Sequence, residues 1–170
     1  VEIYSRQRAD DPVSLDREIR YVAVFRLPAG EFRVKLHAAE APITVGNFLR
    51  LVRSGFYDGL TFHRVVPGYF ALGGDPTGTG IGGPGYSIPD EITNLRHDGP
   101  GILSMANTGP GTGGSQFFIT YSAAPDFDGR YSVFGRIIEG TEVVESLGVS
   151  DAGITERVGN VIISVTITEE

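Results

Sequence analysis

The chain has 170 residues, of which 41% are hydrophobic and 21% are charged, a composition typical of one folded domain. Its formal net charge of -7 argues against binding to nucleic acid or to an anionic membrane surface. There is no cysteine, which excludes disulfides, a catalytic thiolate and cysteine-ligated zinc. No apolar run approaches the roughly 20 residues that a membrane-spanning helix needs, so we expect no membrane span.

The beginning of the chain differs in composition from the rest. Residues 1–17 are rich in polar and charged side chains and predict an N-terminal extension, followed by one domain over residues 18–170. Because the chain begins at Val1 rather than at methionine, we expect that an upstream segment was removed. The sequence leaves the compartment open between cytoplasmic and exported.

Two segments have the pattern of helices. Residues 41–55 predict a helix of about three turns, with Pro42 suited to its first turn and Gly55 to its end. Its apolar residues fall on one helical stripe: Val45, Phe48, Leu49 and Val52. A second, shorter helix is predicted over residues 141–148, with Thr141 as its N-terminal cap.

Eight short segments have the apolar and β-branched character of strands. They are residues 19–27, 31–37, 60–66, 69–72, 101–107, 115–121, 131–138 and 160–168. Eight strands with two separate helices predict a mainly β fold, a closed eight-stranded antiparallel β-barrel capped by the two α-helices. Side chains fill the interior of a barrel of this size, so a site would lie on its outer wall. Glycine-rich loops at residues 73–85 and 99–114 would roof that site.

Most motifs of cofactor and metal chemistry are missing. GTGIGG (78–83) matches the dinucleotide pattern letter by letter, but Pro84 follows it, so the required helix cannot begin there. His37, His63 and His97 share no short metal-ligand spacing, and no G-x-S-x-G elbow is present. We therefore expect neither a cofactor nor a metal.

Isolated polar residues in apolar strands remain as candidates for chemistry: Arg64, Asn107 and Gln116. Aromatic residues accompany them: Tyr69, Phe70, Phe118 and Phe127. From the residues alone two interpretations stay open. The aromatic rings could belong to the core, with the polar groups paired within the sheet, or the two sets could together form a site.

Five segments, in this order and with these gaps, carry a more specific signal. FHRVVPGYF, GGD, GPGILSMAN, GSQFFIT and DGRYSVFG closely resemble the cyclophilin family of peptidyl-prolyl cis-trans isomerases, over residues of about 20 to 168. The resemblance implies the cyclophilin-like barrel. It also implies a non-covalent, metal-independent isomerase that assists protein folding. Such an enzyme acts as a monomer on proline-containing peptides and on unfolded or flexible proteins.

The same resemblance implies roles for individual residues. Arg64 matches the catalytic arginine, Phe118 the floor of the proline pocket, and Asn107 a residue that holds the substrate backbone. The remaining groove residues implied by the match are Tyr69, Phe70, Leu72, Ala106, Gln116, Phe127 and Tyr131.

Two positions depart from the family pattern. Leu72 stands where the family typically has a glutamine that helps to hold the arginine, which leaves open the alternative of a proline-peptide-binding module with weak or no catalysis. Asp126 stands where cyclosporin-binding members carry tryptophan, so tight binding of cyclosporin is not expected.

Overall fold

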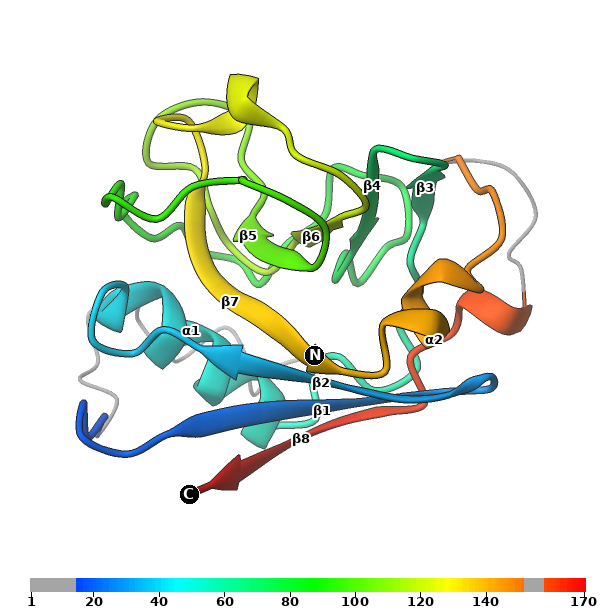
Figure 1. Ribbon diagram of the computed structural model, residues 1–170, viewed down its shortest axis with the longest axis horizontal. Helices are drawn as coiled ribbons and strands as arrows, with labels where there is room; N and C mark the ends of the chain where they lie inside the picture. The colour runs from blue at the N-terminus through cyan, green and yellow to red at the C-terminus, as the bar shows by residue number, and fades with distance from the viewer. Residues whose placement is uncertain (1–14, 152–157) are drawn as a thin grey trace.

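The computed structural model of the chain describes residues 15–151 and 158–170, which form one antiparallel sheet with two α-helices (Figure 1). In chain order the elements are β1 (Tyr21–Leu27), β2 (Gly30–Leu36), α1 (Pro42–Arg53), β3 (Arg64–Val66), β4 (Phe70–Gly73), β5 (Ile102–Met105), β6 (Phe117–Thr120), β7 (Ser132–Glu139), α2 (Thr141–Glu145) and β8 (Ser164–Glu169). Single turns of 3-10 helix occur at Pro125–Phe127 and Val158–Asn160. The mainly β class is confirmed.

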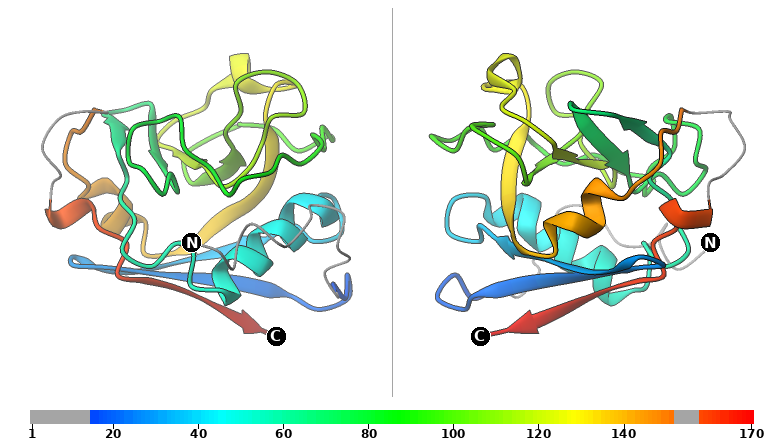
Figure 2. Two further views of the ribbon diagram at one scale, coloured as in Figure 1. Left: turned by 180° about the vertical axis from the view of Figure 1, so that it is seen from behind. Right: turned by 45° about the vertical axis from the view of Figure 1, so that its right-hand side comes forward.

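The sheet curls around the core without closing into a complete barrel. Its strand order is β3-β4-β6-β5-β7-β2-β1-β8, which leaves β3 and β8 as the two edges (Figures 1 and 2). Near these edges the described residues form only isolated bridges, which pair Thr61 with Val161 and Val65 with Ser150. The predicted closed barrel is therefore wrong in this respect. With three residues, β3 offers too few N–H and C=O groups for a continuous ladder to β8.

Helix α1 follows its predicted pattern closely. It begins at Pro42, and all four stripe residues are buried. The Glu91 carboxylate accepts hydrogen bonds from the backbone N–H groups of Ile43 (3.2 Å) and Thr44 (2.6 Å), so a negative charge lies at the positive end of the helix. Gly55 follows the helix with a φ of 73°, in the left-handed region that favours glycine.

Helix α2 is shorter than predicted, and Thr141 is its first residue rather than its cap. The cap residue is Gly140, whose φ is 82°. A Cβ atom at this position would lie 2.3 Å from the carbonyl oxygen of Glu31, so the chain can make this turn only with glycine.

The core between the curled sheet and α1 is rich in phenylalanine. Phe25 and Phe32 stack with their ring centroids 4.6 Å apart, and Phe117 meets Phe25 edge-on at 5.6 Å. Phe48 of α1 contacts Phe117 at 6.1 Å in the same edge-on manner. These inward rings anchor β6, whose alternate residues are then directed outward.

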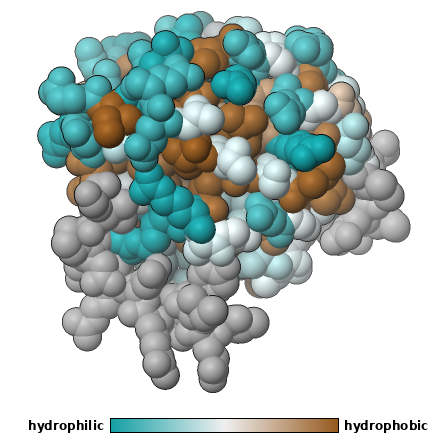
Figure 3. All heavy atoms as spheres, turned by 90° about the horizontal axis from the view of Figure 1, so that it is seen from below, coloured by the Kyte–Doolittle hydropathy of each residue, from teal (hydrophilic) through white to brown (hydrophobic). Residues whose placement is uncertain are grey.

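Polar side chains line the edge strand β8. Arg53 of α1 pairs with Glu169 at 2.7 Å, and Arg20 pairs with Glu170 at 3.5 Å. On this side of the molecule polar and apolar side chains are interspersed (Figure 3). Charges on an edge strand discourage pairing with a second sheet.

Two further expectations concern parts of the chain outside the sheet. Of the predicted N-terminal extension, residues 1–14 lie outside the described residues, and Leu15 packs against the core. Within the described ranges, no helix has the length and apolar character to cross a bilayer.

Candidate active site

Four residues form one row across the outer face of the sheet. Arg64 on β3 lies opposite Leu72 on β4, and Leu72 lies opposite Phe118 on β6. Ser104 on β5 lies opposite Phe118 and completes the row. The residues next to them in sequence pack in the core: Val65, Ala71, Leu103 and Phe117. Because alternate strand residues point to opposite faces, the row lies on the outer wall.

Arg64 keeps its charge at the surface beside an aromatic ring. Its side chain is 51% exposed, and its Nε lies 3.9 Å from Oδ1 of Asp151. The central carbon of the guanidinium lies 5.6 Å from the centroid of the Phe70 ring. The guanidinium is therefore partly desolvated by an apolar neighbour, yet it is still accessible to a ligand.

The aromatic residues predicted for the site form a cup next to Arg64. Phe118 is only 5% exposed and lies at its base. Its ring centroid is 6.1 Å from that of Phe70, 5.3 Å from that of Phe127 and 5.3 Å from that of Tyr131. Tyr69 stacks on Phe127 at 5.3 Å and extends the wall outward. The arrangement suits a small apolar ring lying against Phe118.

The outer rim of this cup is polar. The Tyr69 hydroxyl donates a hydrogen bond to Oδ2 of Asp126 at 3.2 Å. Asp126 lies in the 3-10 turn Pro125–Phe127, directly before the wall residue Phe127. A carboxylate thus lies on the rim of the cup, at the position where the sequence departs from the pattern expected for cyclosporin binding.

Asn107 lines the groove, and its side chain is engaged in hydrogen bonds within the protein. Its Nδ2 donates to the carbonyl of Arg130 (2.9 Å), and its Oδ1 accepts from the N–H of Gly109 (3.1 Å). The preceding Ala106 is held by its N–H, which donates to the carbonyl of Gln116 at 2.9 Å. Within the described residues, no backbone bond uses the N–H or C=O of Asn107. Both groups are available to an extended peptide.

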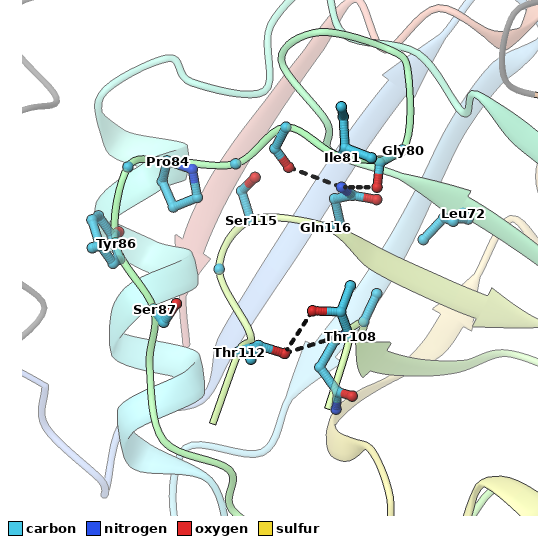
Figure 4. A pocket seen from close by; sticks show the side chains of 16 residues that line it. Leu72, Gly80, Ile81, Pro84, Tyr86, Ser87, Thr108, Thr112, Ser115 and Gln116 are labelled. Carbon is cyan, nitrogen blue, oxygen red and sulfur yellow. Dashed lines mark hydrogen bonds between the residues drawn. The ribbon is translucent and has the colours of Figure 1, made fainter. Parts of the chain in front are cut away.

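A second hollow adjoins the cup on the other side of Leu72. It has a volume of about 460 Å³, and Leu72, Ile81, Ala106 and Gln116 are among the residues that line it (Figure 4). Nε2 of Gln116 donates to the carbonyls of Gly80 and Gly82, each at 2.9 Å. Gln116 therefore fixes the loop that forms one rim of the hollow.

Asp75 holds the same loop through a second set of hydrogen bonds. Its carboxylate accepts bonds from the N–H and hydroxyl of Thr77, both at 2.8 Å, and from the N–H groups of Gly80 and Gly82. Burial alone raises the pKa of a carboxyl, but these donors outweigh it and hold the pKa of Asp75 below its usual value. The segment 78–83 opens no helix, so the dinucleotide pattern has no structural counterpart.

Three residues that the sequence did not identify support the cup from below. The His97 ring stacks on Phe118 at 5.7 Å and is almost fully buried. Its Nδ1 lies 2.8 Å from Oδ1 of Asp128, and its Nε2 lies 2.9 Å from Oγ of Ser104. The order Asp-His-Ser is that of a hydrolase triad, but Ser104 is completely buried and cannot reach a substrate. The network therefore links the base of the cup to the loop that carries Phe127.

His63, next to Arg64, is a buried group without a partner. It is 5% exposed, and in the described part of the chain neither ring nitrogen has a hydrogen bond. Burial lowers the pKa of His63 below its usual value, and the charge of Arg64 acts in the same direction, against the opposing charge of Asp75. Burial therefore favours the neutral form of His63 over its charged form.

Residues that could bind a metal are dispersed within residues 15–151 and 158–170. These residues contain no group of three histidine, aspartate or glutamate side chains that could hold an ion. What the site offers is a guanidinium, an aromatic cup and free backbone groups on one face.

Comparison with known proteins gives a consistent result. Residues 22–168 match the family model described as cyclophilin type peptidyl-prolyl cis-trans isomerase. Peptidyl-prolyl cis-trans isomerase CYP18-2 of Arabidopsis thaliana is 48% identical over 132 residues, covering 75% of this chain and 80% of that protein. A peptidyl-prolyl cis-trans isomerase of Synechococcus elongatus is 46% identical over 138 residues, covering 80% of this chain and 94% of that protein.

The solved structures agree. The crystal structure of a cyclophilin type peptidyl-prolyl cis-trans isomerase from Cryptosporidium parvum superimposes with a TM-score of 0.78 at 35% identity, covering 89% of this chain and 99% of that one. The same protein was crystallised in the presence of the dipeptide Ala-Pro, and that structure gives a TM-score of 0.76 at 35% identity, covering 88% of this chain and 99% of that one. Sequence and fold comparisons thus agree, and the chain belongs to the cyclophilin-type peptidyl-prolyl cis-trans isomerase family.

Proposed function

We propose that this chain accelerates rotation about Xaa-Pro bonds at the groove around Arg64, with Arg64, Phe118 and Asn107 as the residues that act on the substrate. The observation that carries the proposal is the position of the half-exposed guanidinium beside an aromatic cup on one face of the sheet. Neither a nucleophile nor a metal is required, because the reaction makes and breaks no σ bond.

The reaction is slow because rotation disrupts amide resonance across a barrier of roughly 18–20 kcal/mol. As the bond twists, the proline nitrogen regains its lone pair and becomes a hydrogen-bond acceptor. A guanidinium beside that nitrogen donates a bond that exists mainly in the transition state, which is the condition for raising kcat. Arginine suits this role because it stays charged and presents a rigid fork of donors.

The other residues hold the two halves of the substrate. The cup of Phe118, Phe70 and Phe127 takes the pyrrolidine ring, while the free N–H and C=O of Asn107 bind the chain that precedes it. One half is thus fixed while the other turns. An acceleration of about 10⁴–10⁶-fold corresponds to roughly 5.5–8 kcal/mol, which one charge-assisted contact together with positioning can supply.

The substrates we propose are proline-containing peptides and accessible prolines in unfolded or flexible proteins. The groove is open, and the Cryptosporidium parvum relative was crystallised with a proline dipeptide. We also propose that the protein acts as a monomer and binds neither nucleic acid nor cyclosporin tightly. The net charge of -7 opposes nucleic acid, and the carboxylate of Asp126 replaces an apolar contact for the drug.

A proline-limited refolding assay tests the activity. We expect the purified protein to increase the slow refolding rate in proportion to its concentration. If a folded preparation leaves that rate unchanged, the proposed activity is refuted. Exchange between the cis and trans NMR signals of a short proline peptide then separates the isomerase from the alternative binding module, since a module would shift the signals without exchanging them.

A further inference from the structure

The immediate surroundings of Arg64 include few groups that fix its orientation. Its cross-strand neighbour is Leu72, an apolar side chain that accepts no hydrogen bond. The central carbon of the guanidinium lies 5.6 Å from the centroid of the Phe70 ring. This contact limits how closely the guanidinium approaches the sheet, but it does not fix how the group is rotated. In the described part of the chain, Asp151 supplies the carboxylate within 4.0 Å of this guanidinium.

Asp151 is held at this place by the backbone next to it. The N–H of Val65 donates to the carbonyl of Ser150 at 2.8 Å, and Oγ of Ser150 donates to the carbonyl of His63 at 3.2 Å. The segment that follows α2 therefore runs beside β3, as both figures of the ribbon show (Figures 1 and 2). The residue after Ser150 is thereby brought next to Arg64.

A second contact fixes the start of the same segment. The buried side chain of Asn160 accepts from the N–H of Gly148 at 2.9 Å and donates to its carbonyl at 2.8 Å. Because Gly148 is hydrogen-bonded to Asn160 and Ser150 is paired with β3, the backbone that leads to Asp151 has little conformational freedom.

The geometry points to a role for this carboxylate. Its Oδ1 lies 3.9 Å from Nε of Arg64, so the carboxylate approaches the guanidinium from the Nε side rather than from its terminal nitrogens. We propose that Asp151 is a positioning residue that turns the terminal nitrogens of Arg64 toward the substrate, an inference that rests on the proposed function. A long arginine side chain loses rotamer freedom when it binds, and a fixed partner lowers that cost before the substrate arrives.

The pair contributes little to the stability of the fold. The two side chains are 51% and 67% exposed, and exposed ion pairs of this kind are weak and screened by salt. The effect is therefore expected in the rate of isomerisation and at low ionic strength, rather than in the free energy of unfolding.

The test compares the parent with Asp151→Asn in the peptide exchange assay. We expect kcat to fall about two- to fivefold at low salt, with KM nearly unchanged and with the same loss for peptides carrying lysine or glutamate beside proline. At about 1 M salt the kcat values of the two proteins should become equal, because charges are then screened over a distance of about 3 Å. Asp151→Glu should restore most of the rate.

Glu169→Gln is the matched control, because it removes the same charge from an exposed ion pair on the far edge strand β8. It should leave kcat unchanged. Equal kcat for Asp151→Asn and the parent would overturn the proposal. So would a loss confined to KM of the lysine peptide, which would mean that Asp151 binds a basic substrate residue instead.

A spectroscopic readout keeps the test independent of activity. If Asp151 orients Arg64, the Nε–H proton of Arg64 should exchange with water faster in Asp151→Asn than in the parent. Absence of catalysis by the parent would refute the proposed function, while the exchange rate of this proton would still decide whether Asp151 positions Arg64.

Discussion

Replacing Asp75 tests whether this residue holds the loop that forms one rim of the hollow beside Leu72. Its two carboxylate oxygens accept four hydrogen bonds, and the side chain is 1% exposed. In Asp75→Asn the amide oxygen can replace one carboxylate oxygen, but the NH₂ group then faces the N–H groups of Gly80 and Gly82. Two bonds to a charged acceptor are lost, each contributing about 1.5–3 kcal/mol.

We expect the free energy of unfolding of Asp75→Asn to fall by about 3 kcal/mol at pH 7, measured by urea denaturation with an unchanged m value. Because the loop carries Gly80 and Gly82, to which Gln116 is bonded, KM should rise for peptides long enough to reach the hollow. Asp98→Asn is the control, since Asp98 is 62% exposed and pairs with Arg136 on the surface. It should change the free energy by less than about 0.5 kcal/mol.

The pH dependence gives an independent check with a definite sign. The pKa of Asp75 is lower in the folded protein than its ordinary value of 3.8. Its contribution to stability is therefore complete above that ordinary value and is lost as the pH falls through the folded pKa. The parent should lose more stability than Asp75→Asn in this acid range, because the variant lacks the contribution of Asp75. Equal unfolding midpoints of the two proteins at pH 7 would refute this account of the loop.

Three further predictions follow from buried groups near the groove. Tyr57→Phe should lower the free energy of unfolding by about 1–2 kcal/mol in urea denaturation, because the Tyr57 hydroxyl donates to the buried carbonyl of Ser115 at 2.9 Å; an unchanged midpoint would contradict this. Phe118→Leu should fold and raise KM roughly tenfold in the exchange assay, since each aromatic contact that the ring loses is worth about 0.5–1.5 kcal/mol; an unaltered KM would remove Phe118 from the pocket. Because the pKa of His63 is lowered, its neutral form stabilises the fold above the ordinary value of 6.5, and this contribution is lost as the pH falls from 6.5 through the folded pKa. His63→Phe should reduce the slope of stability against pH in that window, and an unchanged slope would show that His63 does not titrate there.

Helices and strands could be predicted from the sequence where one face of the element is buried and the opposite face is exposed. The stripe of α1 identified the helix because its buried residues recur with the helical period. The strands β5 and β6 were predicted too long, because all of their residues are buried and no alternation of exposed and buried positions marks where they end. The gap between the edge strands β3 and β8 could not be predicted from the local sequence. It depends on how far these two segments, which are distant in the sequence, continue to pair.

The residues of the candidate site also divide into those that the sequence identified and those that it did not. Arg64 stood out because a charge interrupted an apolar strand, and its place in one row with Leu72 and Phe118 follows from the register of β3, β4 and β6. His97, Asp128 and Asp151 were not found, because each reaches the site through contacts between segments far apart in the sequence. Neither the spacing of residues in the sequence nor the period of a hydrophobic pattern predicts such contacts.

The central claim is that the Arg64 guanidinium stabilises the twisted bond. The most direct measurement is the cis-trans exchange rate of a proline peptide at saturating concentration with the parent, Arg64→Ala and Arg64→Lys, together with the binding constant of each. We expect Arg64→Ala to lose at least about tenfold in kcat, with peptide affinity and unfolding free energy nearly unchanged and with Arg64→Lys only partly active. An Arg64→Ala variant that exchanges the peptide as fast as the parent would contradict the account.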